Sequence, residues 1–381
     1  MNDTIKNMSV ILCEDMAHIT SGHYAVRFAE LAQGFLDLGC NVHLLTSIGW
    51  AHADSFIFDP DKVHSYTKLG KFLFRFSQNH PTWWPFSGTI RNFLLANEAR
   101  CVAKKIGRNR STIICISGGM EPLALMVGGG KNDWIIHRFD SKPRRMSGIL
   151  RSVVYSIKRM KNIKCLVVVS DKITLRAWHA ARPEQMTAVV TLAGTTKVSK
   201  TDGARTKLEM AEGSSNALLF GDGHNQKLPL TAVEAFSQRP NWNLYIVGKI
   251  ANVVLDKYSQ KKLPSNVICV PGAVSNIDRH LWHSAADVAV LSFERNYHRN
   301  SGTLMDAVSY GCRVVVSDES AAAYITRKYQ LGTIFPPGDV DGLINALDNL
   351  MPLDASMHAK ALEDFSNKQI AIDHLKSGGY I

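Results

Sequence analysis

The sequence lacks the segments that would carry a chain into or across a membrane. Residues 1–15 show no charged start followed by an apolar run and a small-residue cleavage site, which is the pattern of a secretory signal peptide. No apolar run approaches the roughly 20 residues that a membrane-spanning helix needs. We therefore expect a cytoplasmic protein, with peripheral attachment to the inner face of the membrane left open.

Cysteine is scarce, and its seven residues are scattered. None has the short spacing of a zinc or redox motif, and several, such as Cys115 and Cys165, lie in apolar strand-like runs. This pattern indicates buried free thiols in a reducing compartment. The sequence also contains no G-x-G-x-x-G fingerprint and no D-x-D-type acidic pair placed to bind a metal ion. We expect neither a cofactor nor a metal site.

What the chain does have is length, an ordinary apolar fraction and an excess of positive charge. Its 381 residues suit two domains, and the 45% hydrophobic and 20% charged residues are typical of a folded globular protein. The formal net charge of +11 favours an anionic partner: phosphates, a phospholipid surface or nucleic acid. Charge alone does not choose among these.

Short apolar runs alternate with longer amphipathic stretches along most of the chain, which is typical of βαβ units and parallel sheets. The pattern predicts strands at 8–14, 41–47, 111–118, 133–139, 165–171, 186–193, 216–221, 243–248, 267–271, 288–293, 313–318 and 332–335. It predicts helices at 22–38, 229–238, 276–285, 302–310, 319–329, 339–350 and 354–377.

A polar interval at 197–216 separates the two halves of this α/β pattern. We expect an N-terminal Rossmann-like domain at 1–197 and a second Rossmann-like domain at 198–353. A C-terminal helix at 354–381 should pack back toward the first domain. Open α/β sheets bind ligands at the carboxyl ends of their strands, so a cleft between the domains is the expected active site.

The first candidate binding segment is FGDGHNQKLPLTAVEAF at 220–236. A strand ends at Gly221, and Lys227 follows in a loop, where its ammonium can face a diphosphate. A solvated loop lysine is the alternative. The next strand ends at Gly248.

The second segment is HRNSGTLMDAVSYGCRVVVSD at 298–318. Ser301, Gly302 and Thr303 begin a helix whose bare N–H groups and positive dipole end form an anion site. Asp306 follows within about a turn, where a carboxylate can bind ribose hydroxyls. The alternative is that Ser301 or Thr303 only caps a core helix and Asp306 complements its dipole.

Together these segments resemble the nucleotide-binding domain of the GT-B glycosyltransferases, the family-4-like enzymes (glycosyl transferases group 1) in particular. The resemblance covers roughly residues 200–350. It implies that 198–353 is the nucleotide-sugar-binding domain and that 1–197 is the domain on the acceptor side. It rests on Gly221, Lys227, Ala235-Phe236, Val247-Gly248, Pro271-Gly272, Ala286-Asp287-Val288, Gly311 and Val314–Val316.

The resemblance implies that Lys227 binds the donor diphosphate and that Asp306 stands at the second glutamate of the family signature, the ribose ligand. His298 stands at the first glutamate, which contacts the donor sugar, and Asp222 replaces the arginine usual beside the first glycine. These departures leave the donor sugar open.

The N-terminal half resembles the same architecture more loosely. Gly22 lies in the turn after the first strand, where the family brings backbone close to the donor phosphates. In WIIHRFD at 134–140, His137 or Asp140 matches the place of a residue beside the sugar and the acceptor hydroxyl. A carboxylate at Asp140 could accept the acceptor's proton. The alternatives are that Gly22 only precedes a helix, that His137 is a core histidine and that Asp140 is a loop aspartate.

Two segments indicate what the basic charge contacts. Residues 141–170 carry eight Lys or Arg and no acidic residue before Asp171, with an apolar stripe at helical spacing, which suits an anionic membrane surface. Residues 71–95 interleave Phe and Trp with Lys and Arg, as in an interfacial belt. The alternative for 141–170 is an ordinary sheet-covering helix with a solvated basic face. The alternatives for 71–95 are an acceptor-binding pocket and the core.

The sequence therefore predicts a GT-B glycosyltransferase that moves a sugar from a nucleotide-diphosphate sugar to a lipid-linked or polysaccharide acceptor at the membrane, with retention and without nucleic acid as partner. The predicted catalytic residues are Asp140, His137 and His298. A sugar-nucleotide epimerase and a non-catalytic GT-B binding subunit are the rival interpretations.

Overall fold

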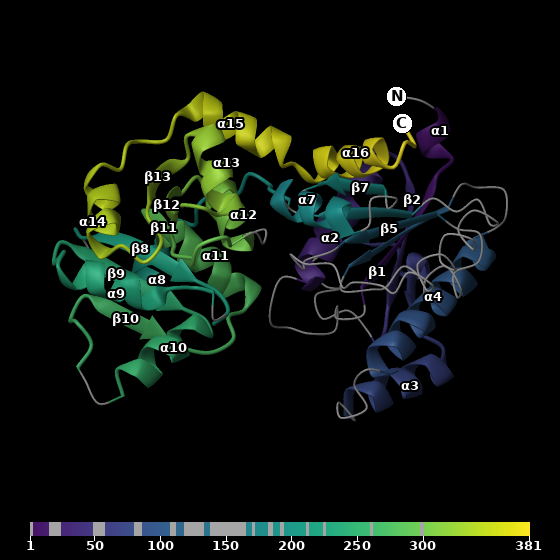
Figure 1. The fold of residues 1–381 in the computed structure, drawn as a ribbon, viewed down its shortest axis with the longest axis horizontal. Helices are drawn as coiled ribbons and strands as arrows, with labels where there is room; N and C mark the ends of the chain where they lie inside the picture. The colour runs from purple at the N-terminus through teal and green to yellow at the C-terminus, as the bar shows by residue number, and fades with distance from the viewer. Residues whose placement is uncertain are drawn as a thin grey trace. The chain divides into compact units, whose positions relative to one another are not determined.

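The computed structural model describes residues 3–14, 24–48, 58–79, 86–106, 112–117, 133–137, 165–169, 172–181, 186–190, 194–210, 213–223, 226–259, 262–297 and 301–381. The chain divides into two compact units (Figure 1). Unit 1 is Met1–Gly194 together with Asn367–Ile381, and unit 2 is Thr195–Ser366. Each unit is described by itself.

Unit 1 is a seven-stranded sheet in the order β3-β2-β1-β4-β5-β6-β7, and all neighbouring strands are parallel. Its strands are β1 (Ser9–Glu14), β2 (Asn41–Thr46), β3 (Val63–Ser65), β4 (Thr112–Ser117), β5 (Asp133–His137), β6 (Cys165–Val169) and β7 (Met186–Val189). Its helices are α1 (Asp3–Lys6), α2 (Tyr24–Asp37), the 3₁₀ turn η2 (Pro60–Lys62), α3 (Lys68–Asn79), α4 (Phe86–Ile106), α7 (Lys172–Ala181) and α16 (Asn367–Ser377).

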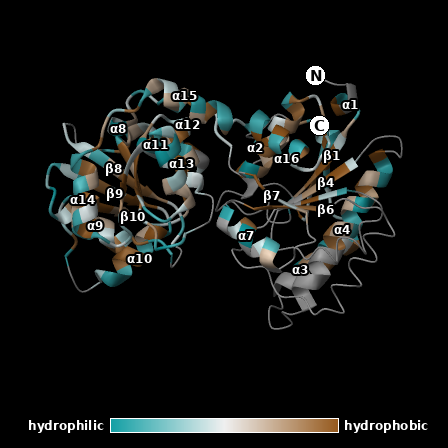
Figure 2. Cartoon of the chain, turned by 45° about the horizontal axis from the view of Figure 1, so that its top comes forward, coloured by the Kyte–Doolittle hydropathy of each residue, from teal (hydrophilic) through white to brown (hydrophobic). Residues whose placement is uncertain are grey.

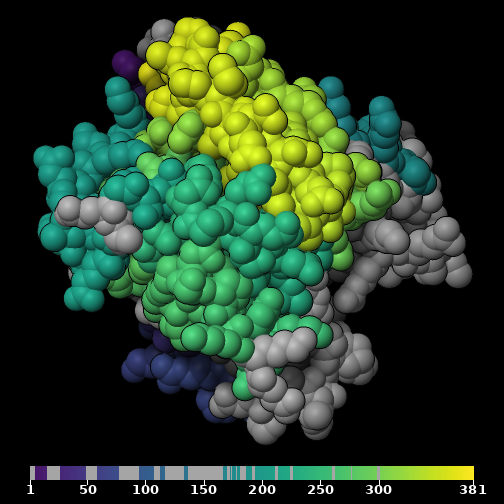
Figure 3. Space-filling model, turned by 90° about the vertical axis from the view of Figure 1, so that its left-hand side faces the viewer, coloured from purple at the N-terminus to yellow at the C-terminus, as the bar shows by residue number. Residues whose placement is uncertain are grey.

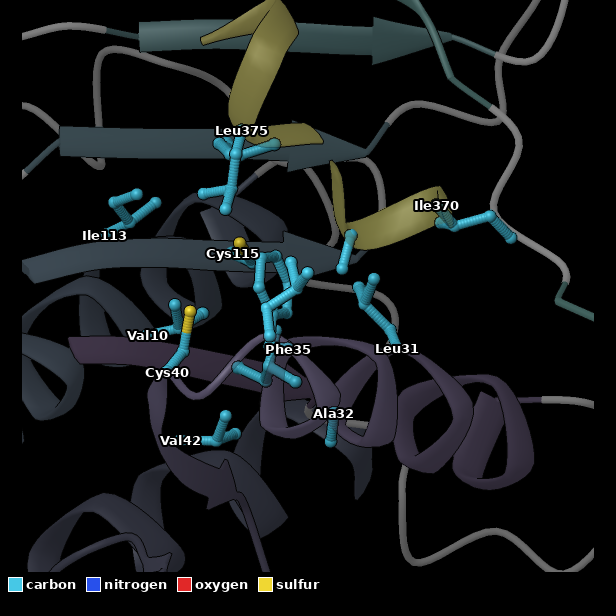
Figure 4. Packing of buried hydrophobic residues seen from close by; sticks show 14 of the residues in the cluster. Val10, Leu31, Ala32, Phe35, Cys40, Val42, Ile113, Cys115, Ile370 and Leu375 are labelled. Carbon is cyan, nitrogen blue, oxygen red and sulfur yellow. The ribbon is translucent and has the colours of Figure 1, made fainter. Parts of the chain in front are cut away.

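Both faces of this sheet are buried, as a parallel sheet requires. On one face Phe35 of α2 and Leu375 of α16 pack with strand residues such as Cys115 (Figure 4). α2 and α16 approach closely because Gly34 has no side chain: a Cβ there would overlap the carbonyl of Asn367. The other face buries Trp134, Trp178 and Phe74 under α3, α4 and α7.

Unit 2 is a six-stranded sheet in the order β10-β9-β8-β11-β12-β13, again parallel throughout. Its strands are β8 (Ser215–Phe220), β9 (Trp242–Val247), β10 (Val267–Val270), β11 (Val288–Leu291), β12 (Arg313–Ser317) and β13 (Gly332–Phe335). Its helices are α8 (Ala204–Lys207), α9 (Pro229–Ser237), α10 (Ile250–Lys257), α11 (Asn276–Ala285), α12 (Gly302–Ser309), α13 (Ala321–Tyr329), α14 (Val340–Asp348) and α15 (Ala355–Asp364).

Hydrophobic strands lie between helices in unit 2 as well, and the polar colours gather on the outer sides of the helices (Figure 2). α15 packs against α12 and α13, where the Tyr329 hydroxyl donates to Asp364 at 2.6 Å. In Figure 3 the yellow residues of α14 and α15 lie against the greener residues of the same unit. The sheet order, in which the chain winds outward in both directions from β8 and β11, is that of a Rossmann-type domain.

The predicted fold class, two Rossmann-like parallel sheets with helices, is confirmed. Every predicted strand is present and begins at or next to the predicted residue. The cleft stays a prediction, because it depends on how the units are placed. The predicted ranges did not include β3, which has only three residues, or α10 (IANVVLDK), which carries adjacent valines without a clear helical pattern. They also did not include α1, η2, α3, α4 and α7 of unit 1. The predicted helix 354–377 is two helices, α15 and α16, which end and begin on either side of Phe365-Ser366.

None of the helices that the structure describes is both long enough and apolar enough to span a bilayer.

Candidate functional site

The point where the winding of unit 2 reverses lies between β8 and β11. The two strands pair only at Ala217 with Val288 and at Leu218 with Ala289 in the described ladder. β8 continues to Phe220 and β11 to Leu291 beyond that pairing. Such a switch point, at the carboxyl ends of the strands, is where open α/β sheets bind their ligands.

Two side chains from separate segments converge on the end of β8. The Lys227 Nζ donates to the carbonyl oxygen of Phe220 at 3.3 Å, and the Thr303 hydroxyl donates to the same oxygen at 3.4 Å. The sequence predicted a loop lysine and a helix start as separate donor ligands. The structure brings these two residues to one backbone atom at the switch point.

The backbone around Lys227 is held against the segment after β11. Leu228 N donates to the Ser292 carbonyl at 3.0 Å, and Glu294 N donates to the Gln226 carbonyl at 2.9 Å. Lys227 itself forms an antiparallel bridge with Phe293. These bonds fix the backbone from which the lysine side chain extends, and the bond of its Nζ to the Phe220 carbonyl holds the far end. Less conformational freedom is therefore lost when the ammonium binds an anion than for an exposed lysine.

The ammonium of Lys227 is poorly solvated. Burial lowers the pKa of Lys227 to about 8, and the nearby carboxylate of Asp222 opposes that shift. A cation held away from water gains more from an anionic ligand than an exposed lysine does. This environment favours the diphosphate-ligand interpretation over a solvated loop lysine.

Two glycines make room for this arrangement. Gly221 has a φ of +122°, and a Cβ there would lie 2.8 Å from the Lys227 Nζ. Gly248 has a φ of +103°, and a Cβ there would lie 2.7 Å from the Gly221 carbonyl oxygen. Only glycine combines these backbone angles with such close approach. The predicted donor residues Gly221 and Gly248 therefore shape the backbone next to the ammonium.

α12 begins beside Lys227. Ser301 is its N-cap, and the Ser301 hydroxyl accepts from Leu304 N at 3.2 Å. The first amides of an α-helix have no partner within the helix, and the positive end of the helix dipole lies with them. Since Thr303 reaches Phe220, the amides of Gly302 and Thr303 lie at the same end of the sheet as the lysine.

Asp306 is buried one turn further along α12, on the side that faces α11. Its Oδ1 lies 3.5 Å from the Arg279 Nη2, and its Oδ2 lies 3.9 Å from the His283 Nε2. Burial lowers the pKa of His283, and its Nδ1 lies 2.9 Å from the Arg279 carbonyl oxygen. A ribose at Asp306 would therefore meet a carboxylate that Arg279 already orients. The ribose role stays a prediction.

Sequence reasoning missed three contributors to this site: the Phe220 carbonyl, Arg279 and His283. The last two stand four residues apart on α11 and so share a helix face, which is a readable signal. Nothing in the sequence indicates that this face meets Asp306, because the contact is between separate elements. Every residue has a backbone carbonyl, so the residue types do not show that the Phe220 carbonyl is an acceptor at the site.

The remaining predicted residues belong to other segments. Gly22, Asp140 and His298 lie outside the described residues. His137 ends β5, where its backbone pairs with Ser117 and Val168. Within the described parts of the chain, no three His, Cys, Asp or Glu residues gather as they would around a metal ion. That the reaction needs no metal stays a prediction from the sequence.

Comparison with known proteins bears on the fold and on unit 2. Residues 217–352 match the family model described as glycosyl transferases group 1. This range contains Gly221, Lys227, Gly248 and the whole of α12. No curated protein matches the chain.

Solved structures of similar fold match almost the whole chain. A glycosyltransferase from Rickettsia africae is 12% identical, with 97% of each chain covered and a TM-score of 0.68. HepE of Anabaena, in complex with UDP-glucose, is 13% identical, with 98% of this chain and 100% of that chain covered and a TM-score of 0.65. A UDP-forming α,α-trehalose-phosphate synthase from Burkholderia xenovorans, in complex with glucose-6-phosphate, is 13% identical, with 97% and 100% covered and a TM-score of 0.65. At these identities the likeness shows the fold, which is that of the GT-B glycosyltransferases.

Proposed function

We propose that this chain, a GT-B fold whose residues 217–352 match glycosyl transferases group 1, transfers a sugar from a nucleoside-diphosphate sugar to a glycan or lipid-linked acceptor at a membrane surface. The observation that carries the proposal is the convergence of Lys227 and the start of α12 on the Phe220 carbonyl. The UDP-glucose bound to HepE supports a UDP-sugar as the first donor to test.

In this proposal the donor diphosphate lies between the Lys227 ammonium and the amides of Gly302 and Thr303. Transfer breaks the bond between the sugar C1 and the diphosphate oxygen, and negative charge develops on the leaving group. Fixed donors aimed at that charge, in a site of low polarity, stabilise the transition state. The ammonium and amides can serve this purpose without a metal.

The other roles are proposed from the sequence. Asp306 would bind the ribose, with Arg279 orienting its carboxylate, and His298 would contact the donor sugar. The acceptor hydroxyl loses its proton as its oxygen bonds to C1, and Asp140 or His137 would stand beside it. We propose transfer with retention of configuration.

The site predicts that donor affinity depends on pH. The free ammonium of Lys227 loses its proton as pH rises through about 8. Only the charged form attracts the diphosphate, so affinity for UDP should be constant below about pH 7 and fall up to tenfold per unit above pH 8. Calorimetric titration with UDP between pH 6.5 and 9.5 measures this. In Lys227→Met, binding should be weak and independent of pH over this window; a wild-type profile in that variant would assign the titration to another group.

A donor-turnover assay tests the function and separates its rivals. The chain is incubated with UDP-sugars and a membrane extract, and the nucleotide and glycan products are identified. Release of UDP with a lengthened glycan supports transfer. An isomerised donor without UDP release would indicate an epimerase, and an unchanged donor across the nucleotide-sugar series would indicate a non-catalytic binding subunit.

A further inference from the structure

The α3 helix of unit 1 carries a row of exposed apolar side chains. Leu69 is 67% exposed, Phe72 is 63% exposed and Phe76 is 49% exposed. At about 100° per residue these three positions fall within about 60° of one another on the helix, so they form one row. We call these residues the α3 stripe. Large apolar side chains exposed in a row mark an interaction surface, whereas scattered single ones do not.

The opposite side of α3 anchors it to α4. Phe74 is buried in the core, and its ring meets that of Tyr66 edge-on at 6.0 Å. A Cβ at Gly70 would lie 2.5 Å from Glu98 Oε1, and the Thr67 hydroxyl donates to the same oxygen at 2.6 Å. Since these separate residues hold the helix in place, we expect α3 to stay folded when the most exposed side chains, Leu69 and Phe72, are replaced.

The charge beside the stripe is of one sign. α3 contains Lys68, Lys71 and Arg75, and no Asp or Glu occurs within its bounds. Lys68 and Arg75 lie on the same flank of the α3 stripe by helical spacing, and both are exposed. An apolar row with a cationic flank is complementary to the surface of an anionic bilayer, where rings enter the headgroup region and the cations meet phosphates.

We propose that α3 is a membrane-docking helix, which inserts Leu69, Phe72 and Phe76 into the surface of an anionic phospholipid bilayer while Lys68, Lys71 and Arg75 contact lipid phosphates. The inference deepens the proposed function by naming the element that brings the chain to a membrane-bound acceptor. Vesicle binding can be measured without any sugar transfer. A failure of membrane docking is therefore distinguishable from a failure of the proposed transferase activity. Figure 1 shows α3 beside α4 at the edge of unit 1.

Vesicle sedimentation of the full chain tests the proposal. Binding should be strong to vesicles of phosphatidylcholine with phosphatidylglycerol, weak to phosphatidylcholine alone, and reduced by added salt. The double variant Leu69→Ser/Phe72→Ser should lower the partition coefficient by about tenfold or more, because both apolar side chains are lost from the interface. Met351→Ser, at a residue of unit 2 that is 71% exposed, should bind like the wild type.

Two triple variants that change the net charge equally measure the contribution of the α3 cations to vesicle binding. Lys68→Glu/Lys71→Glu/Arg75→Glu should abolish the preference for anionic vesicles. Lys207→Glu/Lys257→Glu/Lys376→Glu changes the net charge equally at exposed lysines elsewhere and should retain the preference.

Equal loss in both triple variants would mean that overall charge, and not α3, drives binding, and would overturn the proposal. So would wild-type vesicle binding by the Leu69→Ser/Phe72→Ser variant. A concentration-dependent dimer that this variant disrupts, without vesicle binding by the wild type, would identify a second copy as the occupant. Circular dichroism of each variant confirms that the comparison is between folded proteins.

Discussion

Lys227→Ala should lower sugar transfer by about 100- to 1,000-fold, the range found when one preorganised donor to a developing oxyanion is removed. The backbone on both sides of Lys227 is held by the bonds of Gln226 and Leu228 to the segment after β11, and the loop 221–228 contains no second lysine that could replace it. Initial rates of UDP release with saturating acceptor measure the effect.

The same variant should remain folded. Burial disfavours the charge of Lys227, as its lowered pKa shows, so removing the charge costs the folded state little. A thermal midpoint at or above that of the wild type is expected. Lys207→Ala, at an exposed lysine of α8, should leave both rate and midpoint unchanged. A rate for Lys227→Ala within a factor of two of the wild-type rate would show that Lys227 does not stabilise the leaving diphosphate.

Gly248→Ala should destabilise unit 2 and disturb the backbone beside Lys227. The added Cβ would lie 2.7 Å from the Gly221 carbonyl oxygen, and the φ of +103° is unfavourable for alanine. We expect a loss of about 1–3 kcal/mol in the free energy of unfolding for the backbone strain, and more for the collision. The displaced Gly221 lies against the Lys227 ammonium, so UDP affinity should also fall in the variant that remains folded.

Gly272→Ala is the matched control for this prediction. Gly272 has a similar φ of +111°, but nothing lies within 4 Å of a Cβ placed there. Its loss of stability therefore reports the strain alone. Urea unfolding of both variants gives the difference. Equal losses would show that the close approach of Gly248 to Gly221 has no energetic consequence.

The sequence predicts the sheets well because their signal is local. Buried parallel strands contain continuous apolar runs, such as Val314–Val316 and Cys165–Val169, which locate them from composition alone. β3 has three half-exposed or exposed residues and gives no such signal. The sequence also contains the ligands of the predicted diphosphate site, since Gly221 and Lys227 have a recognisable spacing.

The parts of the site that the sequence does not predict arise from contacts between elements. Arg279 of α11 reaches Asp306 of α12 only because both helices pack beside β8 and β11. Likewise, the sequence presents residues 71–95 as one aromatic and basic stretch. The structure separates α3 into a buried side at Phe74 and an exposed side at Phe72, and this division depends on where α4 lies.

The most direct test of the diphosphate site is a crystal structure of the chain with bound UDP. We predict a phosphate oxygen within hydrogen-bond distance of the Lys227 Nζ, and another at the amides of Gly302 and Thr303 at the start of α12. A diphosphate bound elsewhere, with the Lys227 ammonium still directed only at the Phe220 carbonyl, would contradict the account.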